Sequence, residues 1–567
     1  MKKETLFEAG VILGFAVLLL RLFSIQVRHG AEYDQMALRN HFRYVSIPAP
    51  RGTIWSAEGA MLASNHTATD LVVYREEMGD PEELKRRLGE ILPYRRDEVE
   101  ARWRQMAHTP PYIPHIILSD LEETEVPLME LERVRFPALA VSKPMRRIYP
   151  YGELFSHALG YIAELSPEDQ WAVGAQVGDW VGKAGLERTY EKHLRGEDGR
   201  WAVVVDSHER KVARYLVRPA RDGTPLRTGL RTALHLMARD GFGTDSGAAV
   251  VMDIHSGEVL CYYSSPGYPA VLPTSGPAQA VWRQVFADPR KPMLDRVSQG
   301  TYAPGSVFKV VLAAAALEEG VWGPSRGVFC PGHFQFGNRA FRCWNRGGHG
   351  GVDMKRALTV SCDVYFYQLG LALGVDRIHA WAARFGMEAR TGVDLPFEKT
   401  GLIPSEAWSQ RVRGVPWYPG ETVSVAIGQG PVLTTAMKIC QVYAAIANGG
   451  TLPVPRLARE GEPRRQRVEV SAVTLAFLRE ALGEVVADPR GTAHRVEGVP
   501  TIAGKTGTSQ VMSEVEGRPY TKEHAWFAGF APREDPRVAC VVLREHAGHG
   551  SVAAAPLAAA LMREALQ

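Results

Sequence analysis

The chain has 567 residues, of which 45% are hydrophobic and 23% charged, with a formal net charge of +3. At roughly 150 residues per domain this length predicts several domains, and the apolar content excludes general disorder. The near-zero charge provides no whole-molecule field for binding nucleic acid, so we expect no nucleic-acid partner. Six cysteines are too few for a fold held together mainly by disulfides.

The first element is an apolar stretch at residues 6–27, preceded by two lysines. Its length matches the roughly 20 helical residues that cross a bilayer. A signal peptide is the alternative, but no Ala-x-Ala-like cleavage site follows Val27. We expect a single-pass transmembrane helix at 6–27 in the cell (inner) membrane, with residues 1–5 cytoplasmic and the rest outside the cytoplasm. Glu8 and Arg21 inside the span favour packing against another membrane protein.

Residues 28–225 are mixed in character and rich in charge. They contain a strand-like run at Leu71–Tyr74 and arginine-rich helical segments at Pro81–Leu92 and Asp97–His108. Frequent proline and glycine residues predict small subdomains and extended pieces rather than one layered core.

Residues 226–567 have more regular patterns. Strand-like runs at Ala248–Met252 and Val259–Tyr263 flank a Ser-Gly turn and predict a hairpin. Strands and helices in separate blocks predict an α+β fold with an antiparallel sheet. The other expected elements are helices at 306–319, 363–373 and 553–566 and strands at 499–502, 525–530 and 538–542.

The first chemical motif is Ser306-Val307-Phe308-Lys309, which follows Pro304-Gly305. Positions i and i+3 share a helix face, so the hydroxyl and the amine are expected to be neighbours. A serine needs a base to become a nucleophile, and a partly desolvated lysine can serve as that base. Taken alone, such a serine is more often an ordinary helix cap.

The second motif is Ser361-Cys362-Asp363, at the start of a predicted helix. Its hydroxyl and carboxylate could relay protons to and from the lysine. Taken alone, it is indistinguishable from a helix cap.

The third motif is Lys505-Thr506-Gly507-Thr508, after a short apolar run. A lysine and two hydroxyls on an edge strand would suit a peptide that adds as an extra strand and ends in a carboxylate. A phosphate-binding loop is the competing interpretation, but it requires a glycine where Val499 stands.

The three motifs together, in this order, resemble the class B penicillin-binding proteins, and within them the cell-wall elongation subgroup. Further matching segments cover nearly the whole chain: Pro50–Ile54, Glu58-Gly59, Leu62-Ala63, Arg147–Pro150, His157–Tyr161, Gly185–Glu187, Leu194–Gly196 and Gly428–Gly430. The wider family has asparagine where Asp363 stands. By resemblance, residues 28–225 form an extended pedestal (dimerisation-type) domain and residues 226–567 a transpeptidase domain.

The resemblance implies a peptidoglycan D,D-transpeptidase that β-lactams inhibit. In that reaction Ser306 attacks the D-Ala-D-Ala carbonyl with Lys309 as base, and the N–H groups of Ser306 and Thr508 form the oxyanion hole. Ser361, with Asp363 beside it, passes a proton to the departing D-alanine. The side chains that hold the substrate carboxylate are Lys505, Thr506 and Thr508, on the strand that Gly507 opens to close approach.

A cluster of potential metal ligands comprises Cys330, Cys343, His349 and Cys362. Spacing alone leaves buried thiols or a Cys330–Cys343 disulfide as alternatives. Elongation-subgroup members carry Asp, Asp, His and Cys at similar separations, so the resemblance implies a structural zinc, with His333 as a rival ligand; the chemistry itself needs no cofactor.

The resemblance also implies partners: a SEDS-type, RodA-like glycan polymerase contacting the transmembrane helix and pedestal, lipid-linked peptidoglycan precursor strands, and other elongation-complex proteins. A hydrolase, either a carboxypeptidase or a β-lactamase, is the rival enzyme, since the sequence does not show whether water or an amine resolves the acyl-enzyme. A non-catalytic penicillin-sensing scaffold is the alternative from another class.

Overall fold

The computed structural model describes residues 3–31, 33, 42–106, 114–166, 168–169, 179–205, 211–270, 276–496, 498, 501–510, 514–515, 518–519 and 523–567. The chain divides into two compact units. One comprises Met1–Gly52 and Arg195–Thr224, and the other comprises Thr53–Leu194 and Pro225–Gln567. Lys2, Val499 and His108 lie outside the described residues.

The first unit contains the N-terminal helix α1 (Lys3–Phe23), which continues as a π-helical turn to Arg28. Residues Phe7–Arg28 are apolar and long enough to cross a membrane, with a mean hydropathy of 2.1, and they bury nothing within the chain. An apolar helix with no buried face matches a lipid environment rather than a protein core. The same unit holds an antiparallel sheet of β1 (Phe42–Ile47), β10 (Gly199–Val205) and β11 (Lys211–Arg218).

In the second unit, residues 70–106 and 114–142 form a small subdomain around the sheet β5-β4-β6 (His115–Leu118, Asp70–Val73, Leu139–Ser142). Helices α3 (Pro81–Ile91), α4 (Arg96–Met106) and α5 (Val126–Arg135) pack with it around a separate hydrophobic cluster. Asp80 caps α3 by accepting hydrogen bonds from the backbone N–H groups of Glu82 and Glu83. A small core separate from the main one agrees with the small subdomains that frequent proline and glycine residues predict for this region.

A buried ion pair ties a neighbouring sheet to a short helix. The sheet consists of β12, β2, β3 and β7 (Leu226–Arg227, Ile54–Trp55, Met61–Thr67, Met145–Ile148), and the helix is α7 (Gly185–Thr189). Arg147 Nε lies 2.7 Å from Glu187 Oε1, and both side chains are fully buried. Breaking a pair of this kind typically costs 3–5 kcal/mol, because it leaves an uncompensated buried charge.

The largest sheet is antiparallel, with the strand order β14-β13-β25-β24-β21. Its hairpin β13 (Gly247–Asp253) and β14 (Val259–Ser265) confirms the expected hairpin, and β24 (His524–Ala531) and β25 (Val538–Arg544) confirm two of the expected strands. Among the described strands, β21 (Ala503–Ser509) forms one edge of this sheet and pairs only with β24. This open edge can accept a further extended segment.

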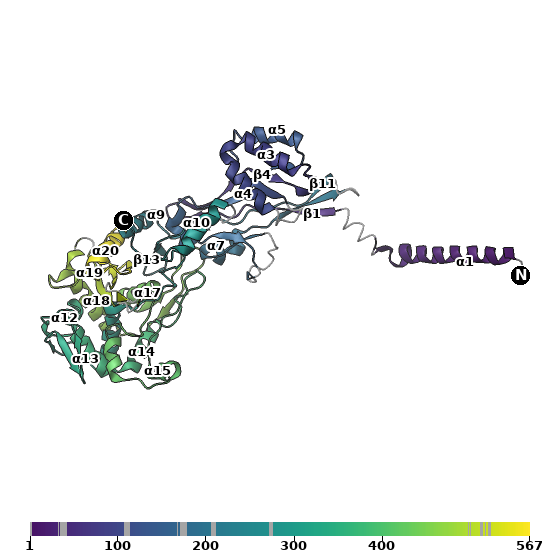
Figure 1. Cartoon of the computed structure of the whole chain (residues 1–567). Helices are drawn as coiled ribbons and strands as arrows, with labels where there is room; N and C mark the ends of the chain where they lie inside the picture. Colours follow the sequence, from purple (N-terminus) through teal and green to yellow (C-terminus); the bar gives the residue numbers. More distant parts are fainter. Residues whose placement is uncertain are drawn as a thin grey trace. The chain divides into compact units, whose positions relative to one another are not determined.

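Helices cover both faces of this sheet (Figure 1). α20 (Ala555–Ala565) packs on β24 and β25, and its neighbour α9 (Thr232–Phe242) packs on β14. α17 (Ala436–Ala447) packs on β25, and α18 (Ala472–Ala487) packs on β21. α11 (Lys309–Glu318) then packs on α18, α13 (Asp363–Leu373) and α14 (Val375–Arg384). The α+β class is confirmed.

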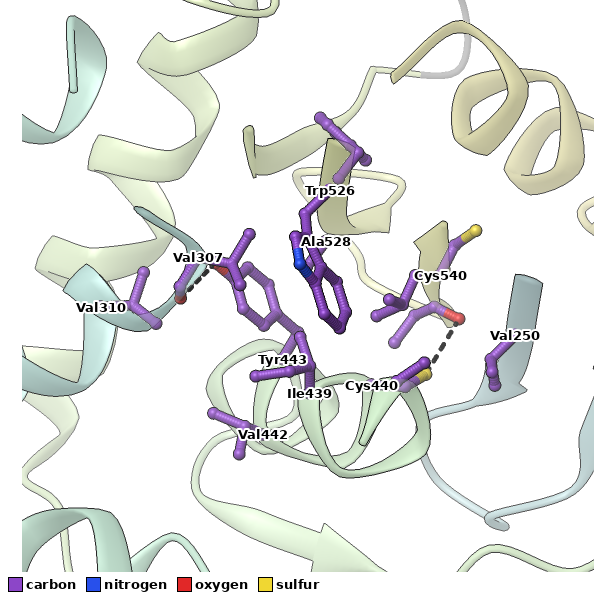
Figure 2. Packing of buried hydrophobic residues seen from close by; sticks show 14 of the residues in the cluster. Val250, Val307, Val310, Ile439, Cys440, Val442, Tyr443, Trp526, Ala528 and Cys540 are labelled. Atoms are coloured by element: carbon purple, nitrogen blue, oxygen red, sulfur yellow. Dashed lines mark hydrogen bonds between the residues drawn. The ribbon is translucent and has the colours of Figure 1, made fainter. Parts of the chain in front are cut away.

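Helix α17 links the sheet to the Ser306 motif. All twelve of its residues are buried, and Figure 2 shows its side chains between the Ser306 turn and the sheet. Tyr443 donates a hydrogen bond of 3.0 Å to Val307 O, and Cys440 Sγ lies 3.7 Å from Ala539 O on β25. From β24, Trp526 Nε1 donates to Ala303 O. The sheet and α17 together therefore fix the backbone on both sides of Ser306.

Candidate active site

The Ser306 turn is tighter than expected. A 3₁₀ turn at Gly305–Phe308 precedes α11, so the α-helix begins at Lys309 rather than at Ser306. Gly305 has φ +57°, and its N–H donates to Gly428 O at 2.9 Å. Side chains three residues apart eclipse in a 3₁₀ turn, so Ser306 and Lys309 still share one side. The N–H of Ser306 lies in the first turn, where no intrahelical acceptor exists.

Lys309 joins the first two motifs. Its side chain is fully buried, and Nζ donates to Asp363 Oδ1 at 2.7 Å, to Ser361 O at 3.1 Å and to Ser361 Oγ at 3.2 Å. An ammonium has three donors, so these bonds satisfy all of them. A buried cation requires this compensation. The structure thus brings Lys309, Ser361 and Asp363 together.

The second motif has a strained backbone. Ser361 has φ +54°, a conformation uncommon for a residue other than glycine, aspartate or asparagine. Asp363 begins α13, and its Oδ2 accepts a hydrogen bond of 2.9 Å from Trp344 N. The two oxygens of Asp363 are therefore divided between the lysine and a backbone amide, which fixes the carboxylate. Strain of about 1–3 kcal/mol at one residue persists only where the surroundings impose it, and such residues cluster at active sites.

Lys505, on the edge strand β21, is fully buried. Burial places the pKa of its amine well below the ordinary value; the positive charge of Lys309 lowers it further, and Asp363 opposes the shift. The third motif is thus electrostatically coupled to the first two. Thr506 Oγ1 donates to Thr492 Oγ1 at 2.7 Å, which anchors the strand to the segment that follows α18.

Thr508 faces the open edge of β21. Its carbonyl accepts a hydrogen bond of 3.2 Å from Gln429 Nε2. A Cβ on Gly305 would lie only 2.6 Å from Thr508 O, so the Ser306 turn lies directly against this carbonyl. The N–H and C=O of one strand residue point to the same edge. The N–H of Thr508 therefore points away from β24, toward the side on which the Ser306 turn lies.

Three contacts of this site escaped the sequence analysis: Trp344 N with Asp363, Thr492 with Thr506, and Gln429 with Thr508. Gln429 lies in Gly428-Gln429-Gly430, just after α16 (Pro419–Val425). In the sequence this segment matches the family but indicates no role for the glutamine. Two glycines around a polar side chain are a signal of a tight loop. Nothing in the sequence alone shows what a loop some 80 residues before Thr508 touches.

The four potential metal ligands form a second cluster. The ligand atoms of Cys330, Cys343, His349 and Cys362 all lie within 4.8 Å of one another. His349 Nδ1 is 3.7 Å from Cys330 Sγ and 3.5 Å from Cys343 Sγ. His333 lies on β16 (His333–Phe336) with an exposed side chain and is not in the cluster.

The cluster fits a tetrahedral metal ion. A nitrogen ligand about 2.0 Å and a sulfur ligand about 2.3 Å from a tetrahedral zinc are roughly 3.5 Å apart. This is close to the distances of 3.7 and 3.5 Å from His349 Nδ1 to Cys330 Sγ and Cys343 Sγ. All three cysteines are buried and unbridged. A hydrogen bond from Cys362, with help from His349 and backbone amides, holds the pKa of the Cys343 thiol well below its usual value. Three thiols and an imidazole are the donor set of structural zinc sites. The other three cysteines, Cys261, Cys440 and Cys540, lie in the core, as expected.

Comparison with known proteins identifies two family models along this chain. Residues 247–563 match the penicillin binding protein transpeptidase domain, and residues 46–228 match the penicillin-binding protein dimerisation domain. Peptidoglycan D,D-transpeptidase MrdA of Acinetobacter baumannii is 30% identical over 96% of this chain and 84% of its own length.

Solved structures give the same result. The penicillin-binding protein PBP2 of Helicobacter pylori, in complex with MreC, matches with a TM-score of 0.82 and 26% identity, over 93% of this chain and 99% of the other. A chain from a peptidoglycan synthase complex, described as coordinating polymerization and crosslinking, matches with a TM-score of 0.73 and 29% identity, over 99% and 97% of the two chains.

Proposed function

The chain belongs to the penicillin-binding protein transpeptidase family, and we propose that it is the serine-type D,D-transpeptidase that cross-links peptidoglycan stem peptides during cell-wall elongation. The observation that carries this proposal is the convergence of the three motifs: Lys309 contacts Ser361 and Asp363, and the Ser306 turn lies against Thr508. A nucleophile, a base and an open strand edge are the parts that acyl transfer from a peptide requires.

In the first step, Ser306 Oγ attacks the carbonyl of the penultimate D-alanine and its proton passes to Lys309 Nζ. Only a neutral amine has the lone pair for this step, and the cationic form is the one that donates three hydrogen bonds to Ser361 and Asp363. Binding of substrate beside Lys309 must therefore favour the neutral amine.

The developing oxyanion would lie between the N–H groups of Ser306 and Thr508. Such preorganised donors stabilise the transition state by about 3–4 kcal/mol each. When the bond to the terminal D-alanine breaks, the leaving amine takes a proton from Lys309 through the Ser361 hydroxyl, which lies 3.2 Å from Nζ. An amine of a neighbouring peptidoglycan strand then attacks the ester carbonyl. The new amide bond replaces the bond to Ser306 Oγ, and the proton of the amine passes to Ser306 Oγ.

The edge strand β21 would hold the donor peptide as an added strand. Thr506 and Thr508 would bind its terminal carboxylate, and Gly507 permits close approach of the Ser306 turn, since a Cβ there would lie 3.0 Å from Pro304 O. A carboxylate near Lys505 would favour the charged form of this buried amine. Penicillins would acylate Ser306 because they mimic this donor.

Fluorescent-penicillin labelling of the wild type and of Ser306→Ala tests the proposal. We expect covalent label on the wild type only, and labelling of Ser306→Ala at the wild-type rate would contradict it. Incubation with muropeptides then distinguishes dimers, the expected product, from trimmed monomers, which would indicate a hydrolase. A Ser306→Ala variant that still supports wall synthesis in cells would indicate a scaffold.

We also propose that the cysteine and histidine cluster binds structural zinc through Cys330, Cys343, His349 and Cys362. Cys343 precedes Trp344, whose N–H holds Asp363, and Cys362 separates Ser361 from Asp363. The ion would therefore hold the second motif in place and take no part in the reaction.

Elemental analysis of protein purified without chelators should find about one zinc per chain. We expect Cys330→Ser to lose the zinc and to melt at a lower temperature, because metal binding adds to the free energy of unfolding. The matched control, Cys440→Ala, removes a buried core thiol and should retain the zinc. Absence of zinc from the wild type would contradict the proposal.

We propose further that the N-terminus is cytoplasmic, that the catalytic domain is extracytoplasmic, and that α1 contacts a SEDS-type, RodA-like polymerase. Glu8 and Arg21 are the charged residues between Phe7 and Phe23, and both are exposed. Charges within the bilayer usually pair with another protein. The likeness to a chain of a peptidoglycan synthase complex and to PBP2 bound to MreC supports partners of the elongation complex. Glu8→Leu should weaken co-purification with the polymerase while penicillin labelling stays unchanged.

A further inference from the structure

We propose that Gln429 is a positioning residue for the oxyanion hole, an inference that rests on the proposed function. Its side chain belongs neither to the three motifs nor to the metal cluster, yet its amide nitrogen donates to Thr508 O at 3.2 Å. Through this bond Gln429 would hold the carbonyl of Thr508, and with it the strand residue on which the substrate must pair.

The main chain of Gln429 is itself firmly held. Its N–H donates to Ser424 O at 3.0 Å, in the turn that ends α16, and Gly428 N–H donates to Val425 O at 2.9 Å. Gly428 has φ +68°, and its O accepts from Gly305 N–H at 2.9 Å. The backbone of this loop is therefore attached to the Ser306 turn while the Gln429 side chain reaches the Thr508 strand.

These contacts define a three-part clamp: the Ser306 turn, the Gly428-Gln429 loop and Thr508 on β21. Backbone packs on backbone throughout, because a Cβ on Gly428 would lie 2.3 Å from Gly305 O and a Cβ on Gly305 would lie 2.6 Å from Thr508 O. Both proposed oxyanion donors, the N–H groups of Ser306 and Thr508, belong to parts of this clamp. Displacement of Thr508, whose carbonyl Gln429 holds and whose own N–H is one of these donors, would misdirect that donor.

The hydrogen bond from Gln429 leaves Thr508 O able to accept a second hydrogen bond. A carbonyl has two lone pairs, so Thr508 O can accept from Gln429 and from an amide of the added substrate strand at once. Gln429 would therefore support substrate pairing rather than compete with it. If it competed instead, removing its side chain would accelerate acylation.

The test measures the second-order rate of penicillin acylation at Ser306. One neutral hydrogen bond contributes about 1 kcal/mol, which corresponds to a rate about fivefold lower in Gln429→Ala, with the first-order acylation constant reduced and the initial binding constant unchanged. An unchanged rate, or a faster one, would overturn the inference. Thermal melting of the variant separates this effect from unfolding.

Gln429→Glu gives a readout that a merely structural role would not move. Glutamate is isosteric, but when ionised it only accepts hydrogen bonds and so repels Thr508 O, whereas the protonated acid can donate. We expect slow acylation at pH 8 and recovery toward the wild-type rate as the pH falls to about 5, relative to the wild type at each pH. A variant-to-wild-type ratio independent of pH would contradict the inference. Ser306→Ala in parallel tests the proposed function separately, since its failure to lose labelling concerns the nucleophile alone.

Discussion

At the residue scale, the site depends on a buried cation, Lys309, whose hydrogen bonds all go to a distant segment of the chain, at Ser361 and Asp363. Lys309 has no exposed surface, and its anionic partner Asp363 is itself held by Trp344 N. Desolvation of a charge is expensive, and this cost is tolerable only while all three hydrogen bonds of the amine are made. The side chain is therefore held in one position beside Ser361 and Asp363, as proton transfer through Ser361 requires.

Replacing Asp363 with asparagine should slow penicillin acylation by about 10- to 100-fold, in the range attributed to acid–base groups. The amide oxygen can still accept from Lys309, so we expect the protein to stay folded, whereas Asp363→Ala should destabilise it by about 3–5 kcal/mol by leaving the cation unpaired. Stopped-flow acylation and thermal denaturation measure both effects. The control Glu480→Gln breaks a half-exposed pair with Lys355 and should change stability by less than about 1 kcal/mol. Equal effects at both positions would contradict this assignment.

A second buried lysine, Lys438 on α17, should make stability depend on pH. Burial lowers its pKa to about 8, opposed by the charge of Glu398. Between pH 8 and the unfolded value near 10.5, the unfolded chain binds more protons than the folded one, so the free energy of unfolding rises with pH.

Chemical denaturation at pH 7 to 10 of the wild type and of Lys438→Met measures this contribution. The stability of the wild type relative to the variant should increase above pH 8. Lys355→Met is the control, because Lys355 is half-exposed and its hydrogen bond to Glu480 raises its pKa. The stability of the wild type relative to this variant should not increase above pH 8. A constant difference between wild type and Lys438→Met would refute the expectation.

At the element scale, three backbone segments are packed so closely that only glycine fits between them. The 3₁₀ turn before α11, the loop after α16 and the strand β21 approach at Gly305, Gly428 and Gly507. Interiors packed at this density transmit a small displacement rather than absorbing it. The nucleophile turn therefore takes its position from two distant segments as much as from its own helix.

Gly428→Ala should lower the acylation rate at least tenfold and reduce the melting temperature. The new methyl group would lie 2.3 Å from Gly305 O, and the backbone there has φ +68°. Gly430→Ala is the matched control, because φ is +71° while a Cβ would lie 3.7 Å from its nearest neighbour, Ser424 Cβ. It should suffer only the strain of the left-handed backbone, about 1–2 kcal/mol, with near-normal acylation. Similar acylation rates in both variants would show that the collision is unimportant.

At the scale of the whole molecule, the apolar segment Phe7–Arg28 suits a lipid bilayer, whereas the catalytic fold suits water. The segment buries none of its surface within the chain, whereas the transpeptidase fold packs around a continuous hydrophobic core, which also includes side chains between Ile54 and Leu194. A helix of this length and hydropathy is stable in a bilayer and exposes a large apolar surface in water. Anchoring and acylation should therefore be separable.

Deletion of residues 1–28 should convert the protein from a membrane-bound form that needs detergent into a water-soluble form. The acylation rate of Ser306 should change less than about twofold, because no contact of the site comes from this segment in the part of the chain that the structure describes. Membrane flotation and penicillin labelling measure the two properties. Loss of acylation in a folded, soluble deletion variant would show that the segment contributes to the site.

The sequence alone was sufficient for features that depend on local pattern. The spacing of Ser306 and Lys309, the helix beginning at Asp363 and the hairpin of β13 and β14 follow from turns and periodicities of a few residues, because backbone geometry acts over that range. The order of the motifs then indicated the family and the α+β fold. Even here local reasoning missed a detail, since the start of the expected helix is a 3₁₀ turn, which is hydrogen-bonded to Gly428 through Gly305.

Tertiary structure alone decided which distant groups meet. The contacts of Gln429 with Thr508 and of Trp344 with Asp363, and the choice of His349 over His333 in the cluster, join segments that no local pattern relates. Such contacts arise where a sheet and its covering helices together exclude water. Each buried polar group then needs a hydrogen-bond partner from the protein, and which partner is within reach depends on every element that packs around it.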